Sequence, residues 1–76
     1  MRKKYLGFSA SYIRITGLGG FQEKFISELI SQNINIYEIS QEKSGFIALV
    51  KPDDYLKISR TAKKHGIRLR VSERIG

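Results

Sequence analysis

The sequence predicts an α+β domain built from four strands and two helices. Two segments of the 76-residue chain place apolar residues at helical spacing, and four short segments are rich in β-branched and apolar residues. Glycines and short polar stretches separate these segments. In chain order they alternate as strand, helix, strand, strand, helix and strand, which favours a single sheet covered by both helices.

The first predicted strand covers residues 11–16, and a glycine-rich loop, GLGGF, follows at residues 17–21. The loop lacks the lysine of a P-loop, and Gln22 stands where a dinucleotide-binding fingerprint needs its third glycine. Glycine also permits the positive φ of a sharp turn. We therefore interpret the loop as a tight turn and not as a phosphate-binding site.

The two predicted helices cover residues 21–32 and the segment KPDDYLKISRTAKKHG at residues 51–66. The apolar stripe of the first is expected to face the core and consists of Phe21, Phe25, Ile26, Leu29 and Ile30. Pro52 suits the first turn of the second helix, and Gly66 suits its end. The side chains expected to point inward from the second helix are Tyr55, Leu56, Ile58, Ser59 and Ala62.

The other three strands are predicted at residues 34–40, 45–51 and 67–73. The first of these has an ambiguous phase, which a bulge or two buried faces would reconcile. Residues 45–51 are almost continuously apolar, which is typical of a central strand. The last strand alternates, with Ile67, Leu69 and Val71 expected inward and Arg68, Arg70 and Ser72 outward.

This element order, with right-handed crossovers, predicts a ferredoxin-like split βαββαβ sandwich, with a four-stranded antiparallel or mixed sheet and both helices on one face. The first and last strands would be antiparallel neighbours. Their outward side chains would then meet on the uncovered face, which we expect to bind a partner through Tyr12, Arg14, Arg68 and Arg70. Like charges across neighbouring strands cost stability, so an external anion, Glu38 or Glu73 should offset the arginines.

The net charge of +7 is unevenly placed along the chain. Residues 1–16 hold four bases and no acid, residues 17–50 hold two bases and four acids, and residues 51–76 hold eight bases and three acids. A basic surface attracts nucleic acid or anionic lipid, and the basic termini are candidates for contact with an anionic membrane surface.

No catalytic, cofactor-binding or metal-binding residue is predicted. The chain has no cysteine and no spacing of metal ligands, and its one histidine, His65, stands among bases with no carboxylate or nucleophile close in sequence. Asp53 and Asp54 are interpreted as partners of a helix dipole. We therefore expect a protein that is not an enzyme.

An RNA-binding function is a weaker alternative that the segment KSGFIALV raises. It is similar to the signature strand of RNA-recognition domains, in which two aromatic rings stack on bases. With Phe46 at the first aromatic position, Ala48 occupies the second, and Phe46 is better explained as a core residue. Tyr12 and Tyr37 are the partial replacements that the chain offers.

Most of the chain resembles the N-terminal region of the YqfD family of sporulation proteins. The resemblance lies in a strand that ends in glycine, a helix with an acid near its start, the apolar strand at residues 33–39, and the segment KHGIRLR at residues 64–70. It implies a domain, residues 1–76, that forms the soluble N-terminal part of a longer membrane protein of endospore-forming Firmicutes. The resemblance places this domain on the cytoplasmic face of a membrane in the mother cell.

The leading hypothesis is therefore a cytosolic interaction domain that makes protein–protein or juxtamembrane contacts during forespore development, with partners in the sporulation machinery. A nucleic-acid-binding module that uses the same basic face is the first alternative. A small-molecule-sensing regulatory domain, with its ligand near the strand–helix loop, is the second.

Overall fold

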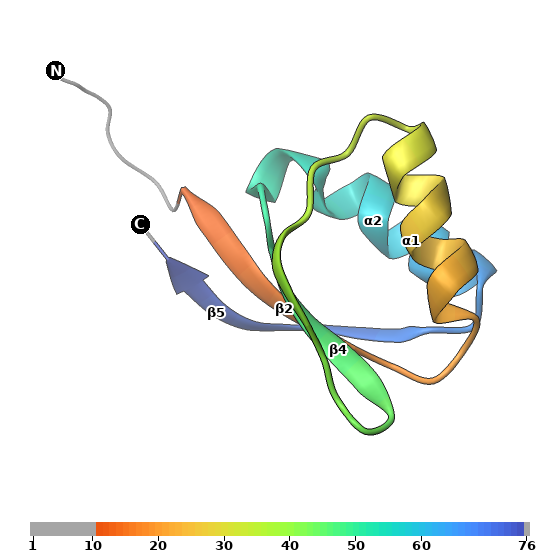
Figure 1. The fold of residues 1–76 in the computed structure, drawn as a ribbon. Helices are drawn as coiled ribbons and strands as arrows, with labels where there is room; N and C mark the ends of the chain where they lie inside the picture. Colours follow the sequence, from red (N-terminus) through yellow and green to blue (C-terminus); the bar gives the residue numbers. More distant parts are fainter. Residues whose placement is uncertain (1–10, 76) are drawn as a thin grey trace, which may run out of the picture.

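The computed structural model describes residues 11–75, which form a four-stranded sheet with two helices on one face (Figure 1). The strands are β2 (Tyr12–Leu18), β3 (Tyr37–Gln41), β4 (Gly45–Val50) and β5 (Arg68–Ile75). The helices are α1 (Gln22–Ser31) and α2 (Tyr55–Lys64), and a short 3-10 turn, η1 (Pro52–Asp54), precedes α2. The predicted ferredoxin-like fold is confirmed.

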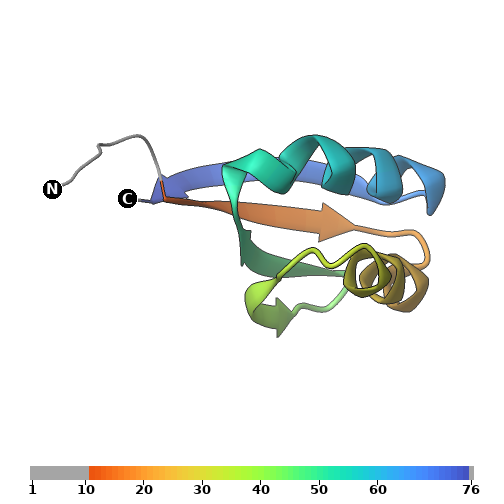
Figure 2. The ribbon, with the colours of Figure 1, turned by 90° about the horizontal axis from the view of Figure 1, so that it is seen from above.

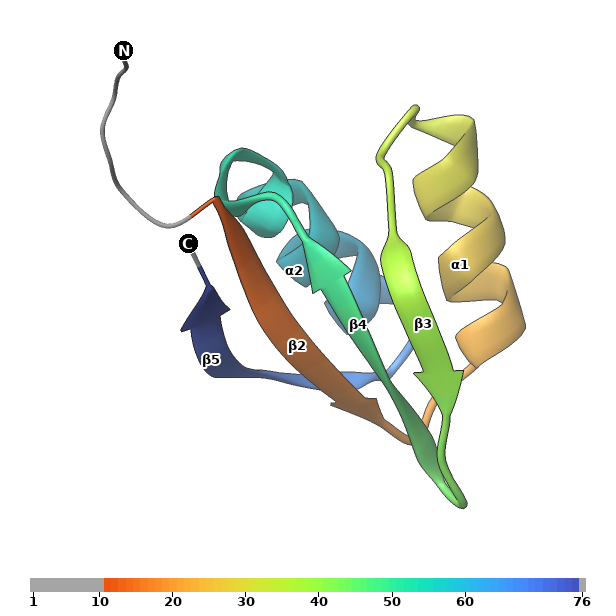
Figure 3. The same cartoon turned by 60° about the vertical axis from the view of Figure 1, so that its left-hand side comes forward.

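The strand order is β3-β4-β2-β5, and every neighbouring pair is antiparallel. As predicted, the first and last described strands lie side by side and the continuous apolar strand β4 is central. Helix α1 lies toward the β3 end of the sheet and α2 toward the β5 end (Figures 2 and 3). The sheet therefore has one covered face, one open face and two unlike edges.

The core lies between the helices and the covered face of the sheet. Phe25 of α1 stacks on Phe46 of β4 with ring centroids 5.6 Å apart, and both rings are buried. The interpretation of Phe46 as a core residue is therefore confirmed. The other large side chains that are fully buried are Ile15, Leu29, Val50 and Ile58.

Two irregularities interrupt the strand pairing. The register of β3 on β4 shifts between Tyr37 and Ser40, where Glu38 has a positive φ of 49°. Of the two explanations for the ambiguous phase of residues 34–40, a bulge or two buried faces, the structure has the bulge. A second shift, opposite Arg14 and Ile15, displaces the outer half of β5 by one residue.

Several side chains that were expected to be inward are exposed. Phe21, Ile30 and Leu56 have exposed fractions of 66%, 63% and 61%. Phe21 precedes the first turn of α1. Ile30 and Leu56 each lie on the side of their helix that faces away from the other helix, where solvent covers them. Val71, predicted inward, is 43% exposed because it lies on the edge strand.

Candidate interaction face

The open face of the sheet is the side opposite the helices. Strand alternation and register place twelve side chains on it: Tyr12, Arg14, Thr16, Leu18, Tyr37, Ser40, Ile47, Leu49, Arg68, Arg70, Glu73 and Ile75. Its centre is apolar, since Leu49 is 8% exposed and Ile47 is half-buried. The charged members all belong to β2 and β5, so the face is basic on one side of an apolar centre.

Two tyrosines meet at one end of the open face. The rings of Tyr12 and Tyr37 have centroids 5.4 Å apart and planes inclined at 82°. Such edge-to-face packing is a preferred arrangement of aromatic pairs. The ring of Tyr12 in β2 is therefore positioned by its contact with Tyr37 of β3, and the two rings form an aromatic patch at this end of the open face.

Arg14 is neutralised by a carboxylate within the face. Its Nε donates to Glu73 Oε1 at 3.0 Å, and its backbone carbonyl accepts a hydrogen bond of 3.2 Å from the Ser72 hydroxyl. Arg14 is paired with Glu73 because of the register shift in β5. The prediction that Glu73 offsets the arginines therefore holds for Arg14, whereas strict alternation had wrongly placed Ser72 on the face in that position.

The remaining arginines form a row along β5. Arg70 pairs with Thr16, the next outward position of β2 after Arg14, and Arg68 pairs with Leu18. At about 3.3 Å per residue, the four residues from Arg14 to Leu18 span about 13 Å, so Arg68 lies far from Arg14. Within residues 11–75, the ion pairs are Arg14–Glu73, Lys64–Glu28 and His65–Glu28, which leaves Arg68 and Arg70 without a carboxylate partner there.

The loop at residues 17–21 is a packed turn. The Gly19 N–H donates to the Ser44 carbonyl at 3.1 Å, and the Phe21 N–H donates to the His65 carbonyl at 2.9 Å. The Gln22 side-chain amide donates to the carbonyls of Gly19 and Ser44. A phosphate cradle needs backbone N–H groups that point at the ligand, and these two are already used. The geometry supports the interpretation of a tight turn.

A polar cluster that the sequence did not predict ties the two helices together. His65 Nε2 lies 2.9 Å from Glu28 Oε1, and Lys64 Nζ donates to Glu28 Oε2 at 3.1 Å. These hydrogen bonds, that of His65 first, hold the pKa of the Glu28 carboxyl below its ordinary value. His65 thus has a carboxylate neighbour in space, although it has none in sequence. Helix periodicity could have indicated this contact, because it places Glu28 on the side of α1 that faces α2.

The part of the chain that the structure describes contains no cluster of three or more side chains suited to a metal ion. Across residues 11–75, neither helix combines the length and apolar character that crossing a bilayer requires. The basic residues Arg2, Lys3 and Lys4, expected to contact an anionic membrane surface, lie outside the described residues.

One comparison with known proteins agrees with the sequence resemblance. No curated protein and no solved structure matches the chain significantly. The family model described as "Putative stage IV sporulation protein YqfD" matches residues 7–76, which is nearly the whole chain. On this match, the chain belongs to the YqfD family.

Proposed function

We propose that this chain is a non-enzymatic interaction domain that binds an acidic protein partner through the open face of its sheet. Family membership makes it a sporulation-related protein. The proposal adds that it is the cytosolic N-terminal part of a membrane protein, acting at the membrane surface of the mother cell. Its contact residues would be Tyr12, Arg14, Arg68 and Arg70.

One observation carries the proposal: the open face combines an apolar centre with two arginines that lack a carboxylate partner within residues 11–75. Arginine is enriched at protein interfaces because its planar fork binds carboxylates through two hydrogen bonds. Leu49 and Ile47 supply apolar area beside the arginines. A protein surface with acidic side chains around an apolar patch has the matching chemistry.

The same geometry disfavours nucleic acid as the main partner. Base stacking on a sheet of this topology needs aromatic side chains on the central strands. The outward residues of the central strand β4 are Ile47 and Leu49, and Phe46 is buried beneath them. Among residues 11–75, the rings on this face are those of Tyr12 and Tyr37, at one end, and these two already pack on each other.

The test compares two double charge reversals that change the net charge equally. Arg68→Glu with Arg70→Glu alters the open face, while Lys57→Glu with Arg60→Glu alters the exposed side of α2. Each protein is used as bait in extracts of sporulating cells, and the recovered proteins are quantified by mass spectrometry. We expect the open-face variant to lose partners that the wild type and the α2 variant retain.

Equal recovery by both variants would refute the open face as the contact surface. Melting temperatures of all three proteins check that each is folded. The nucleic-acid alternative is tested separately by fluorescence anisotropy with single-stranded RNA and with duplex DNA. A dissociation constant below about 10 μM at physiological salt would favour it, since non-specific binding is typically weaker than that.

A further inference from the structure

The two edges of the sheet carry opposite charge. The edge formed by β3 and the outer side of α1 belongs to the acidic middle of the chain, and we call it the acidic edge. The edge formed by β5 and the outer side of α2 belongs to the basic C-terminal third, and we call it the basic edge. They lie at opposite ends of the strand order β3-β4-β2-β5.

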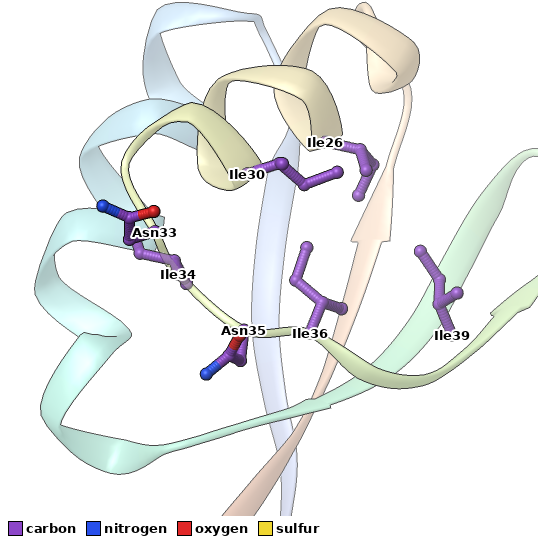
Figure 4. Close-up of a pocket in the computed structure, with 7 residues that line it drawn as sticks. All are labelled: Ile26, Ile30, Asn33, Ile34, Asn35, Ile36 and Ile39. Atoms are coloured by element: carbon purple, nitrogen blue, oxygen red, sulfur yellow. The ribbon is translucent and has the colours of Figure 1, made fainter.

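The acidic edge contains a groove of about 630 Å³ between α1 and residues 33–39, lined by five isoleucines together with Asn33 and Asn35. Ile26 and Ile30 project from α1 toward Ile36 and Ile39 across this groove (Figure 4). Ile30 is 63% exposed and Ile39 is 44% exposed. The groove thus presents branched apolar side chains to solvent.

Acidic side chains accompany the groove. Glu23 precedes Ile26 and Ile30 by three and seven residues, a spacing that places it on the same side of α1. Glu38 is exposed in the bulge of β3, and Glu42 directly follows that strand with the exposed Lys43 beside it, so three acids accompany one base. A partner of this edge therefore needs apolar side chains with bases around them.

The basic edge also combines exposed apolar side chains with charged ones, and here the charges are positive. Leu56, which is 61% exposed, and Lys63 are seven residues apart on the outer side of α2. On β5, Val71 and Arg74 pair with Ile15 and Ile13, so both are on the helix side of the sheet, next to α2. Two exposed apolar side chains and two bases are thus gathered at this edge.

We propose that copies of this chain associate head to tail, with the basic edge of one copy seated on the acidic edge of the next. Charge complementarity selects this arrangement over a two-fold dimer, which would set bases against bases or acids against acids. An interface between two different surface patches is heterologous, so it produces a ring or an open chain of copies.

We expect this contact between copies to involve side chains more than backbone pairing of β3 in one copy with β5 in the next. The bulge at Glu38 disrupts the outer edge of β3, and bulges of this kind hinder the pairing of edge strands. Small interfaces of this type are weak and transient. We therefore expect association at high protein concentration that weakens as salt is added, because screening reduces the attraction between the edges.

The test uses two variants, each altering one edge at a side chain that is more than 60% exposed. Ile30→Lys places a base in the acidic edge, and Leu56→Glu places an acid in the basic edge. Ser27→Lys and Ser27→Glu are the matched controls, since Ser27 is exposed on α1 away from the groove. Sedimentation velocity of the 76-residue protein at low and high salt gives the mass of the associating species.

We expect the wild type and both controls to associate at low salt and each edge variant alone to remain monomeric. Mixing the two edge variants should restore association, because the unaltered basic edge of one meets the unaltered acidic edge of the other. A wild type that is monomeric at about 1 mM overturns the proposal. So does association that only one of the two edge substitutions abolishes, which is the behaviour of a two-fold dimer.

Discussion

Adding one methyl group to the loop at residues 17–21 tests whether the loop is a packed turn. Gly19 and Gly20 have nearly equal positive φ values of 73° and 70°. A Cβ at Gly19 would meet nothing within 4 Å, whereas a Cβ at Gly20 would collide with the His65 carbonyl and lie 2.7 Å from the Gly66 carbonyl carbon. The two alanine variants therefore share the backbone strain and differ in the collision.

The structure sets the expected magnitudes. A left-handed conformation costs a non-glycine residue about 1–2 kcal/mol, so both variants should lose about this much free energy of unfolding. Overpacking adds about 1–3 kcal/mol, and only Gly20→Ala incurs it. In a domain of this size, 1 kcal/mol shifts the melting temperature by roughly 4–8 °C, so Gly20→Ala should melt clearly below Gly19→Ala.

Urea unfolding followed by circular dichroism measures both free energies of unfolding, with inorganic phosphate as an added ligand. The packed-turn interpretation predicts the larger loss for Gly20→Ala and no stabilisation of the wild type by phosphate. Equal losses in the two variants would show that the loop does not pack on the junction of α2 and β5. Stabilisation by phosphate that both substitutions abolish would restore the phosphate-cradle hypothesis.

Three further predictions concern the polar cluster, the open face and the core. The pKa of Glu28 is lowered from 4.5, so its contribution to stability is present above pH 4.5 and is lost as the pH falls through the lowered pKa. Glu28→Gln should therefore reduce the fall in melting temperature that the wild type shows in this acidic range. A double-mutant cycle on Arg14 and Glu73 should give a coupling of about 0.2–1 kcal/mol in chemical unfolding, since both side chains are partly exposed. Phe46→Ala should cost about 3–5 kcal/mol and Phe21→Ala under about 0.5 kcal/mol, and equal values from calorimetry would contradict the placement of the two rings.

The topology was predictable because each element carried a local signal. The glycine-rich loop, the alternation in residues 11–16 and 67–73, and the continuous apolar run before Pro52 depend on neighbouring residues only. The exposed Ile30 and Leu56 were mispredicted for a different reason. Helical periodicity identifies an apolar stripe, but the width of the stripe that is buried depends on how far the sheet extends beneath each helix.

For the open face, the neighbouring strands were predicted correctly and part of the register was wrong, while its role in binding a partner stays a prediction. A bulge displaces every residue beyond it by one position, so Glu73 stands where alternation placed Ser72. The pairing of Glu28 with His65 was missed because 37 residues separate them and only the packing of α1 on α2 brings them together. The register of β5 and the contact between Glu28 and His65 thus depend on tertiary packing that no local pattern encodes.

The two proposals are linked by the geometry of the sheet. Both edges that would meet in a head-to-tail chain lie on the helix side, α1 with β3 and α2 with β5, so successive copies would keep their open faces on the same side. Arg68 and Arg70 would then repeat along the assembly, and weak contacts to an acidic partner would add as avidity. Ile30→Lys, which leaves the open face unaltered, should therefore lower partner recovery. Arg68→Glu with Arg70→Glu should abolish recovery and also weaken association, because both arginines belong to β5, the strand that forms the basic edge. Full partner recovery by the monomeric Ile30→Lys protein would separate the two proposals and show that a single copy suffices for binding.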